Sequence, residues 1–433
     1  MDVFSSQRNC VAIASVLFVI TMSAAAHADE LQDLKDRVDA LHRQVAELER
    51  ATSAGTAGNA VTGGATKGSF KLPGSDTSIT LGGYVKLDAI YSDRSAGVDS
   101  TGDQELEPGS IPVGPGAAAN DRNQVTLHAR QSRLFFKTST PTNRGDLGTY
   151  LEFDLFGASG NESVSNSSNL RLRHAYGTLG GWLFGQTWTT FSDVDAYPET
   201  VDFGGTVGQI FARQAQLRWT QPFADGDWSI ALENPETVAS LPGGAAFRAD
   251  DDRLPDLTTR IRLNTAAGRY SIAGLVRQVR VDSAANPAAR SQKLGAAIGA
   301  NGIVPIGAKD DLRFSAYLGN VLGRYTAGYF TDGVVTASGQ LQLPRQWIAA
   351  ASYRHFWSPT VRSTLALSKL ASEHTSEVAG NVNKNAESAH LNVIWSPFAQ
   401  TNFGLEYIYA RRETQDGQSG QLHRLQAAAQ YLF

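Results

Sequence analysis

The chain has 433 residues, of which 42% are apolar and only 18% are charged, and its formal net charge is −4. A charge so close to zero argues against a nucleic-acid-binding protein, which would normally carry a strong basic excess. The single cysteine, Cys10, excludes a disulfide framework and a cysteine-ligated metal site. Arginine makes up 29 of the 38 basic residues.

Residues 1–28 have the pattern of an export signal. A short polar start precedes an apolar run from Val11 to Ile20 that only Ser15 interrupts, and small residues then lead to an A-x-A sequence that ends at Ala28. The apolar run is too short to span a bilayer as a helix, and the A-x-A sequence is typical of a cleavage site. We therefore expect a cysteine-free mature chain that begins at Asp29. An uncleaved anchor is the alternative.

Residues 29–50 carry a heptad seam. Apolar side chains recur at spacings of three and four residues, at Leu31, Leu34, Val38, Leu41, Val45 and Leu48. The seam predicts a coiled-coil helix that associates with copies of itself, although it is short, and a single amphipathic helix docked elsewhere is the alternative. Residues 51–69, rich in Gly, Ala, Ser and Thr, predict a flexible linker. An assembling helix on a slack linker implies an oligomer.

The body of the chain, residues 70–433, alternates apolar and polar side chains. In one segment Leu151, Phe153 and Leu155 alternate with Glu152 and Asp154, and the same pattern recurs along the body. A period of two predicts strands with one apolar face and one openly charged face. A soluble β-sandwich would also alternate, so the lengths of the connections must decide between the two.

Seven short connections alternate strictly with eight long polar ones. The long connections lie at about 92–124, 157–169, 187–210, 234–256, 281–292, 320–346, 369–387 and 411–422. Fifteen connections separate sixteen strands, and both ends of the body lie at the short-turn rim. Short turns at one rim and long loops at the other are typical of outer-membrane barrels. We therefore predict an all-β transmembrane barrel of sixteen antiparallel strands.

The end of the chain is suited to closing such a barrel. Apolar and aromatic residues alternate with polar ones up to the terminal Phe433, so the last strand can pair with the first and remove both sheet edges. Tryptophans near the expected strand ends suit the aromatic girdles of a membrane barrel, whereas core tryptophans of a soluble fold are the alternative. These are Trp182, Trp219, Trp228, Trp347, Trp357 and Trp395.

Several segments together closely resemble the DcaP-like porins, outer-membrane channels named for dicarboxylic acid uptake. They are FKLPGSDTSITLGGYVKLDAIYS (70–92), ARQSRLFF (129–136), LEFDLFG (151–157), LRLRHAYGTL (170–179), GQTWTTFSDVDAYPETVDF (185–203) and RQAQLRW (213–219). The run 185–203 is the most specific, and the resemblance extends over the helix, the linker and the barrel. It implies sixteen-stranded trimers with an N-terminal coiled coil in the periplasm. The loops 92–124 and 320–346 do not match.

The connection 187–210 is the best candidate for a constriction loop that folds into the barrel. It combines four acidic residues with aromatic anchors such as Phe191 and Phe203. An exposed flap has no need of such anchors, whereas a loop inside the lumen does. A surface loop that contacts lipopolysaccharide or a neighbouring protomer is the alternative. The acidic residues are Asp193, Asp195, Glu199 and Asp202.

Arginine recurs on the polar face of the expected strands, at Arg130, Arg171, Arg173, Arg218, Arg260, Arg262, Arg277, Arg313, Arg354 and Arg362. A barrel of sixteen strands is wide enough for an aqueous channel, and a guanidinium can hold a carboxylate through two hydrogen bonds. These arginines predict a pore lining that favours anions, with the acidic loop facing it across the lumen. The excess of arginine over lysine fits such a role in guiding carboxylates, but a GC-rich genome would produce the same ratio.

Two arginines cannot be assigned to a face. Arg130 and Arg133 are three residues apart and thus have opposite parity: on one regular strand their side chains would point to opposite faces. If both face the same side, a bulge or a change of face must lie between them, so the face on which Arg133 lies stays open. Arg213 lies where the expected loop rejoins the wall, and it could fall on either side. His174 is expected at an interface between protomers.

The eight scattered histidines lack metal-ligand spacing, and neither a nucleophile elbow nor a P-loop pattern occurs. We therefore expect no catalytic residues, metal or cofactor. The sequence favours a bacterial outer-membrane porin for passive diffusion of small anionic solutes, most simply dicarboxylates. As a homotrimer, it would lie among lipid and lipopolysaccharide. A structural or adhesive barrel with a plugged lumen is the alternative.

Overall fold

The computed structural model describes residues 32–48, 61–66, 68–94, 101–161, 164–249, 252–282 and 290–433. The chain divides into two compact units, Met1–Ser78 and Ile79–Phe433. The predicted export signal, Leu31 of the heptad seam and most of the predicted linker lie outside the described residues. In the first unit, β1 (Thr62–Gly63) and β2 (Phe70–Lys71) pair in antiparallel fashion.

A helix over residues 32–48 occupies the predicted coiled-coil segment. The seam residues Leu34, Val38, Leu41 and Val45 are between 44% and 60% exposed. Association through this seam stays a prediction. Within the described ranges, no helix has the length and the apolar character needed to cross a membrane.

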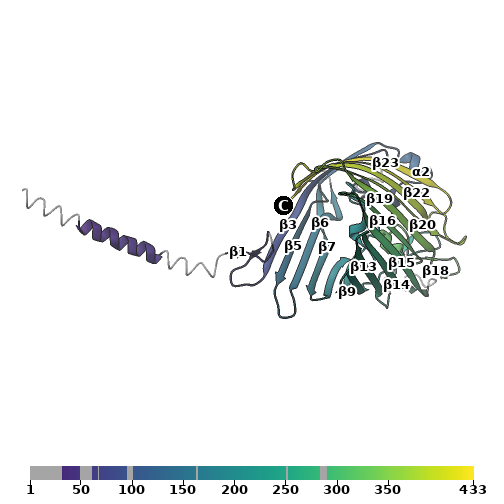
Figure 1. Ribbon diagram of the computed structural model, residues 1–433. Helices are drawn as coiled ribbons and strands as arrows, with labels where there is room; N and C mark the ends of the chain where they lie inside the picture. Colours follow the sequence, from purple (N-terminus) through teal and green to yellow (C-terminus); the bar gives the residue numbers. More distant parts are fainter. Residues whose placement is uncertain are drawn as a thin grey trace, which may run out of the picture. The chain divides into compact units, whose positions relative to one another are not determined.

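The second unit is a closed antiparallel β-barrel, as the sequence predicts, and its described residues form sixteen barrel strands (Figure 1). The interrupted second strand consists of β4 (Gln124–His128) and β5 (Arg133–Thr140). The others are β3 (Ser78–Ser92), β6 (Leu147–Asn161), β7 (Ser167–Leu179), β8 (Trp182–Trp188), β9 (Arg213–Phe223), β10 (Gly226–Glu233), β13 (Asp256–Thr265), β14 (Gly268–Asp282), β15 (Arg290–Ile306), β16 (Asp310–Gly319), β19 (Arg345–Phe356), β20 (Val361–Glu373), β21 (Asn383–Trp395), β22 (Thr401–Thr414) and β23 (Ser419–Leu432).

The last strand closes the barrel. β23 pairs with β3 from Leu432 opposite Tyr84 to Arg424 opposite Ser92, so the sheet has no free edge there. The backbone N–H of Gly83 also donates to the carbonyl of the terminal residue at 3.1 Å.

The interruption of the second strand changes which side chains face inward. Between β4 and β5 the chain makes a turn, in which the N–H of Ser132 donates to the carbonyl of Ala129 at 3.0 Å. This turn supplies the change of face that the opposite parity of Arg130 and Arg133 requires.

The barrel wall has an apolar exterior and a polar interior. On β20, the outward side chains of Leu365 and Leu367 are 47% and 53% exposed, whereas the inward polar side chains of Thr364 and Ser368 are buried. Outward apolar side chains suit contact with hydrocarbon, and the inward polar ones line the lumen.

The connections are short at one rim of the barrel and long at the other, as predicted, but some of the long ones are shorter than expected. Connections at one rim are short, such as 180–181 and 266–267. At the other rim, the hairpins β6–β7 and β22–β23 continue almost to their tips. They leave connections of 162–166 and 415–418, where the sequence analysis expected 157–169 and 411–422. A hairpin can extend beyond the membrane because its backbone hydrogen bonds are satisfied within it.

Three of the long connections, 93–123, 189–212 and 320–344, send apolar side chains into one buried cluster. Its members include Leu106, Phe191, Ile210, Tyr325 and Leu341. These loops carry the short helices η1 (Thr101–Asp103), η2 (Pro108–Ser110), α2 (Pro115–Ala119), η3 (Val194–Ala196) and η4 (Gly323–Thr326). A small separate sheet joins β11 (Val238–Ser240), β12 (Ala246–Arg248), β17 (Gly333–Val335) and β18 (Leu341–Gln342).

Candidate functional site

The connection between β8 and β9, residues 189–212, is called the lumen loop below because it contacts the inner wall at successive strands. Arg260 on β13 donates to a carbonyl of the loop. Arg313 on β16 and Asn392 on β21 each donate to loop carbonyls at 2.7 Å. On β22, Glu406 accepts the N–H of Val201 at 2.8 Å. The loop therefore follows the inside of the barrel from β13 to β22.

The first two acidic residues of the lumen loop are ion-paired with the wall. Asp193 lies 3.1 Å from Arg269, and Asp195 lies 2.8 Å from Arg269 and 3.7 Å from Arg262. From the sequence we expected these carboxylates to face the arginines across open lumen. Direct contact occurs instead, because opposite charges in a partly buried site attract strongly.

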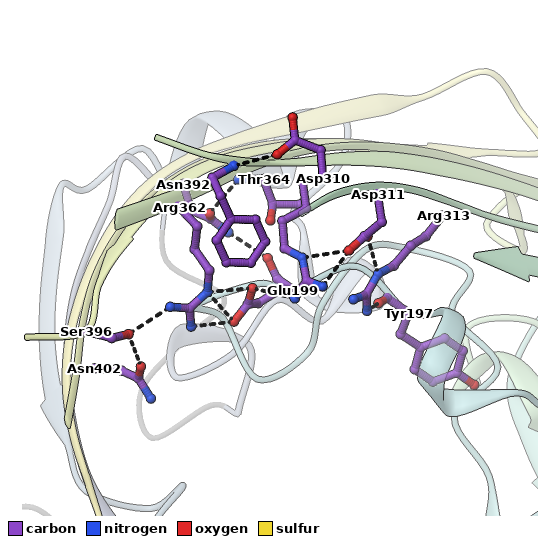
Figure 2. Close-up of polar contacts among 12 residues, drawn as sticks. Tyr197, Glu199, Asp310, Asp311, Arg313, Arg362, Thr364, Asn392, Ser396 and Asn402 are labelled. Atoms are coloured by element: carbon purple, nitrogen blue, oxygen red, sulfur yellow. Dashed lines mark hydrogen bonds and ion pairs between the residues drawn. The ribbon is translucent and has the colours of Figure 1, made fainter. Parts of the chain in front are cut away.

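Glu199, the third acidic residue, is held by two arginines of the wall (Figure 2). Its carboxylate accepts hydrogen bonds from Arg362 at 2.6 and 2.9 Å and from Arg354 at 3.2 Å. Arg354 also contacts Asp311, which in turn contacts Arg313 at 2.8 Å. These five side chains form a continuous charged network from β16 to β20 that fixes the middle of the lumen loop.

The end of the lumen loop is interlocked with the connection 93–123. The N–H of Leu106 donates to both carboxylate oxygens of Asp202, at 3.0 and 3.1 Å. Arg424 on β23 lies 3.8 Å from the same carboxylate and donates to the carbonyl of Gly102 at 2.6 Å. Gly204 permits this approach, because a Cβ there would lie 2.4 Å from the carbonyl oxygen of Leu106.

Glu105 lies beside this interlock and gives it a pH dependence. Burial, reinforced by the carboxylate of Asp202, raises the pKa of Glu105 from 4.5 to about 8. The proton of the Glu105 carboxyl group is therefore bound more tightly when the loop is docked than when it is free. Docking is strongest below about pH 4.5 and weakens as the pH rises toward about 8.

We therefore expect faster amide exchange over residues 101–111 at pH 9 than at pH 6, after correction for the intrinsic rates. Glu105→Gln should remove most of this difference, because the amide cannot ionise. Hydrogen exchange followed by mass spectrometry measures both. Equal protection of the parent protein at the two pH values would contradict the assignment.

Seven of the ten predicted arginines have a carboxylate oxygen within 4 Å: Arg171, Arg173, Arg262, Arg277, Arg313, Arg354 and Arg362. In the part of the chain that the structure describes, no carboxylate lies that close to Arg130, Arg218 or Arg260. Arg218 donates instead to the carbonyl of Trp188 at 2.5 Å. Most of these arginines are thus paired with protein carboxylates rather than open to a solute.

Arg171 and Arg173 on β7 are bound by carboxylates of β6. Arg171 holds Asp154 through two hydrogen bonds of 2.9 and 2.8 Å, and Arg173 contacts Glu152 at 2.7 Å. A register shift opposite Glu152 turns both Arg173 and His174 inward. His174 is 7% exposed, so its expected place at a protomer interface is wrong.

The two arginines that the sequence left open both face the lumen. Arg133 lies 3.5 Å from Glu152. The guanidinium of Arg213 packs over the rings of Trp188 and Phe211, 4.8 and 5.1 Å from their centroids, and its Nη1 is buried without a hydrogen-bond partner. Among the described residues, Arg213 has no carboxylate within 4 Å.

A cavity of about 510 Å³, called the mouth cavity below, lies between the three inward loops and the wall. Three guanidinium groups line it, from Arg171, Arg213 and Arg324, together with the carboxylates of Glu105 and Glu107. Its remaining lining includes the apolar side chains of Leu106, Leu172, Val207 and Phe211. The arrangement can bind an anion that also has an apolar part.

The connection 320–344 is fixed by Arg277, and its inward folding was missed from the sequence. The Arg277 side chain is fully buried and contacts Asp256 at 3.2 Å and Asp332 at 2.6 Å. The signal used for the lumen loop, aromatic residues within a polar connection, recurs at Tyr325 and Phe330 and would have found it. Among the residues described, no group of three or more His, Cys, Asp or Glu could hold a metal ion.

Solved structures similar to this chain include outer membrane proteins. The crystal structure of the outer membrane channel DcaP of Acinetobacter baumannii is 23% identical, with 86% of this chain and 100% of that chain covered and a TM-score of 0.71. OmpT of Vibrio cholerae in its trimer form is 10% identical (82% and 99% covered, TM-score 0.53). Salmonella typhi OmpF in complex with daunomycin is 11% identical (82% and 98%, TM-score 0.52). These similarities show a shared barrel fold.

A comparison with curated proteins found no match. A family model described as "DcaP outer membrane protein" matches residues 23–433, which include every strand of the barrel. The match covers nearly the whole chain, and the fold agrees with it. The chain therefore belongs to the DcaP outer membrane protein family.

Proposed function

We propose that this protein is a porin through which small anionic solutes, in particular dicarboxylates, diffuse across the outer membrane. The observation that carries the proposal is Arg213, a guanidinium in the mouth cavity that has no carboxylate within 4 Å among the described residues. Arg324 lines the same cavity, so a solute with two carboxylates can meet the guanidinium groups of Arg213 and Arg324.

The lumen loop acts as the constriction in this proposal. Its middle is bound to β13–β22 and Phe203 packs on Phe156 of β6, so the proposed solute path runs through the mouth cavity. The arginines then have two roles. Those that hold the loop to the wall are Arg260, Arg262, Arg313, Arg354 and Arg362. Those that line the mouth cavity are Arg171, Arg213 and Arg324.

Arg213→Gln should weaken the preference for anions. A unit positive charge about 6 Å from a passing ion in a water-like medium stabilises Cl⁻ and destabilises K⁺ by about 0.7 kcal/mol each, so its removal should lower the ratio of Cl⁻ to K⁺ permeability about tenfold. Reversal potentials across planar bilayers under a salt gradient measure this ratio. The matched control is Arg248→Gln, because the Arg248 side chain is 76% exposed on β12 and lies outside the mouth cavity. An unchanged ratio for Arg213→Gln would contradict the proposal.

The second candidate function is a structural barrel with a plugged lumen, which is favoured by the entry of the connections 93–123 and 320–344 into the buried cluster. A plugged barrel should show no conductance in the same bilayer recording, whereas a porin should conduct. The effect of Arg213→Gln on permeability can be measured only if the barrel conducts, so the conductance of the parent protein is recorded first.

We also propose that three copies assemble, in part through the helix at 32–48 in the periplasm. The exposed seam of Leu34, Val38, Leu41 and Val45 supports this assembly. OmpT of Vibrio cholerae, which shares the barrel fold, has been solved in a trimer form. The first barrel strand begins at the short-turn rim, which outer-membrane barrels place in the periplasm.

A further inference from the structure

A row of charged side chains faces outward from the barrel on β20–β22. Lys369, Glu387 and Arg411 occupy one register row across these strands. Lys369 lies 2.9 Å and Arg411 4.0 Å from Glu387, and the two cations are 48% and 40% exposed. A lysine or arginine that faces hydrocarbon at the bilayer midplane costs about 2–4 kcal/mol, so this row needs a polar environment.

The height of the row matches the headgroup region of the outer leaflet. β20 begins at Val361 near the short-turn rim, and Lys369 lies eight residues further along the strand. At about 3.3 Å per residue and a tilt of about 40°, Lys369 lies about 20 Å above that point. The apolar band of such barrels is about 25 Å tall, so the cations lie near its outer edge.

A shallow groove runs along the wall beside the row. Its volume is about 460 Å³, and Lys369 and Glu387 lie at one end of it. The other lining residues include Ala349, Ala351, Leu367 and Ala389, and the alanines leave space where larger outward side chains would fill the surface. An apolar groove that ends at a cation matches an acyl chain with a negatively charged headgroup.

A second groove, of about 620 Å³, lies on the other side of β19. It is lined by Val276, Leu294, Ala296 and Leu318, and Arg345 lies at its edge. The two grooves therefore flank one strand, and each has a basic side chain at its border. This repetition favours a ligand with several chains and more than one anionic group.

We propose that β14–β22 bind a phosphorylated, multiply acylated lipid of the outer leaflet, with phosphates at Lys369, Arg411 and Arg345 and acyl chains in the two grooves. Phosphate oxygens accept charge-assisted hydrogen bonds from ammonium and guanidinium groups. Glu387 positions Lys369 and Arg411 for this contact. The alternative occupant, a second copy of the chain, does not account for two apolar grooves that each have a basic side chain at the border.

The test compares lipopolysaccharide retained by variants of the full-length protein, purified in detergent and analysed by native mass spectrometry. Lys369→Glu combined with Arg411→Glu should retain about tenfold less lipopolysaccharide than the parent. The matched control is Lys309→Glu, an exposed position in the turn at the opposite rim, which should retain as much as the parent. Conductance should be unchanged in both, which separates this inference from the proposed function.

A second variant tests the groove without changing charge. Ala349→Leu combined with Ala351→Leu fills the groove, and leucine suits an outward position in the apolar band, so the barrel should fold. Lipopolysaccharide retention should again fall. Full retention by the folded charge-reversal variant would overturn the proposal. Dissociation of the oligomer by that variant with lipid retention unchanged would also overturn it, and would identify an interface between copies.

Discussion

Replacing Arg277 by methionine should cause a large loss of stability. The Arg277 side chain is fully buried between Asp256 and Asp332, whose side chains are also fully buried, and it donates to the carbonyl of Glu236 at 2.6 Å. Methionine keeps much of the apolar volume but leaves the two carboxylates without this cation. Removing one partner of a buried ion pair typically costs about 3–5 kcal/mol, because the remaining charge is left uncompensated.

Urea titration of the folded barrel in detergent, followed by tryptophan fluorescence, measures this loss. Arg144→Met is the matched control, because Arg144 is exposed in the short turn between β5 and β6 and should change the free energy of unfolding little. Arg277→Met should also expose the connection 320–344 to proteolysis, because Asp332 belongs to it. If Arg277→Met unfolds at the same urea concentration as the parent, the buried network does not hold this loop.

The barrel could be predicted because its physical causes act locally along the chain. Hydrocarbon outside and polar groups inside impose the pattern seen on β20, where Leu365 and Leu367 face outward and Thr364 and Ser368 face inward, and each strand shows such a pattern independently. The segregation of short turns and long loops is likewise visible in connection lengths alone. Strand number and order therefore followed from the sequence without any knowledge of contacts between distant residues.

The contacts of the lumen could not be predicted in the same way, because they join residues far apart in the chain. Parity indicates that Arg362 faces inward, but nothing near it in the sequence indicates that its partner is Glu199 on a different connection. Arg213 stayed ambiguous because it begins a strand directly after a loop, where parity has no preceding strand residues to fix it. The sequence thus predicts which arginines face inward but not which carboxylates neutralise them.

Replacing Glu199 by glutamine should loosen the lumen loop while the barrel stays folded. The carboxylate is shared by Arg354 and Arg362, whose side chains are 23% and 16% exposed, and hydrogen bonds to charged groups contribute about 1.5–3 kcal/mol each. Arg354 keeps Asp311, but Arg362 loses its carboxylate partner. Larger fluctuations of the single-channel current are expected, because the loop then samples more positions.

The same substitution should raise the ratio of Cl⁻ to K⁺ permeability about tenfold, since it removes one negative charge, which acts on the two ions with opposite sign, and frees Arg362 toward the lumen. Glu377→Gln, at an exposed position in the connection after β20, makes the same charge change outside the lumen and should leave the ratio unaltered. Glu199→Gln and Arg213→Gln thus shift the reversal potential in opposite directions. Shifts of the same sign would contradict the proposed pore, because removing a negative charge and removing a positive charge act with opposite sign on an ion that passes both side chains.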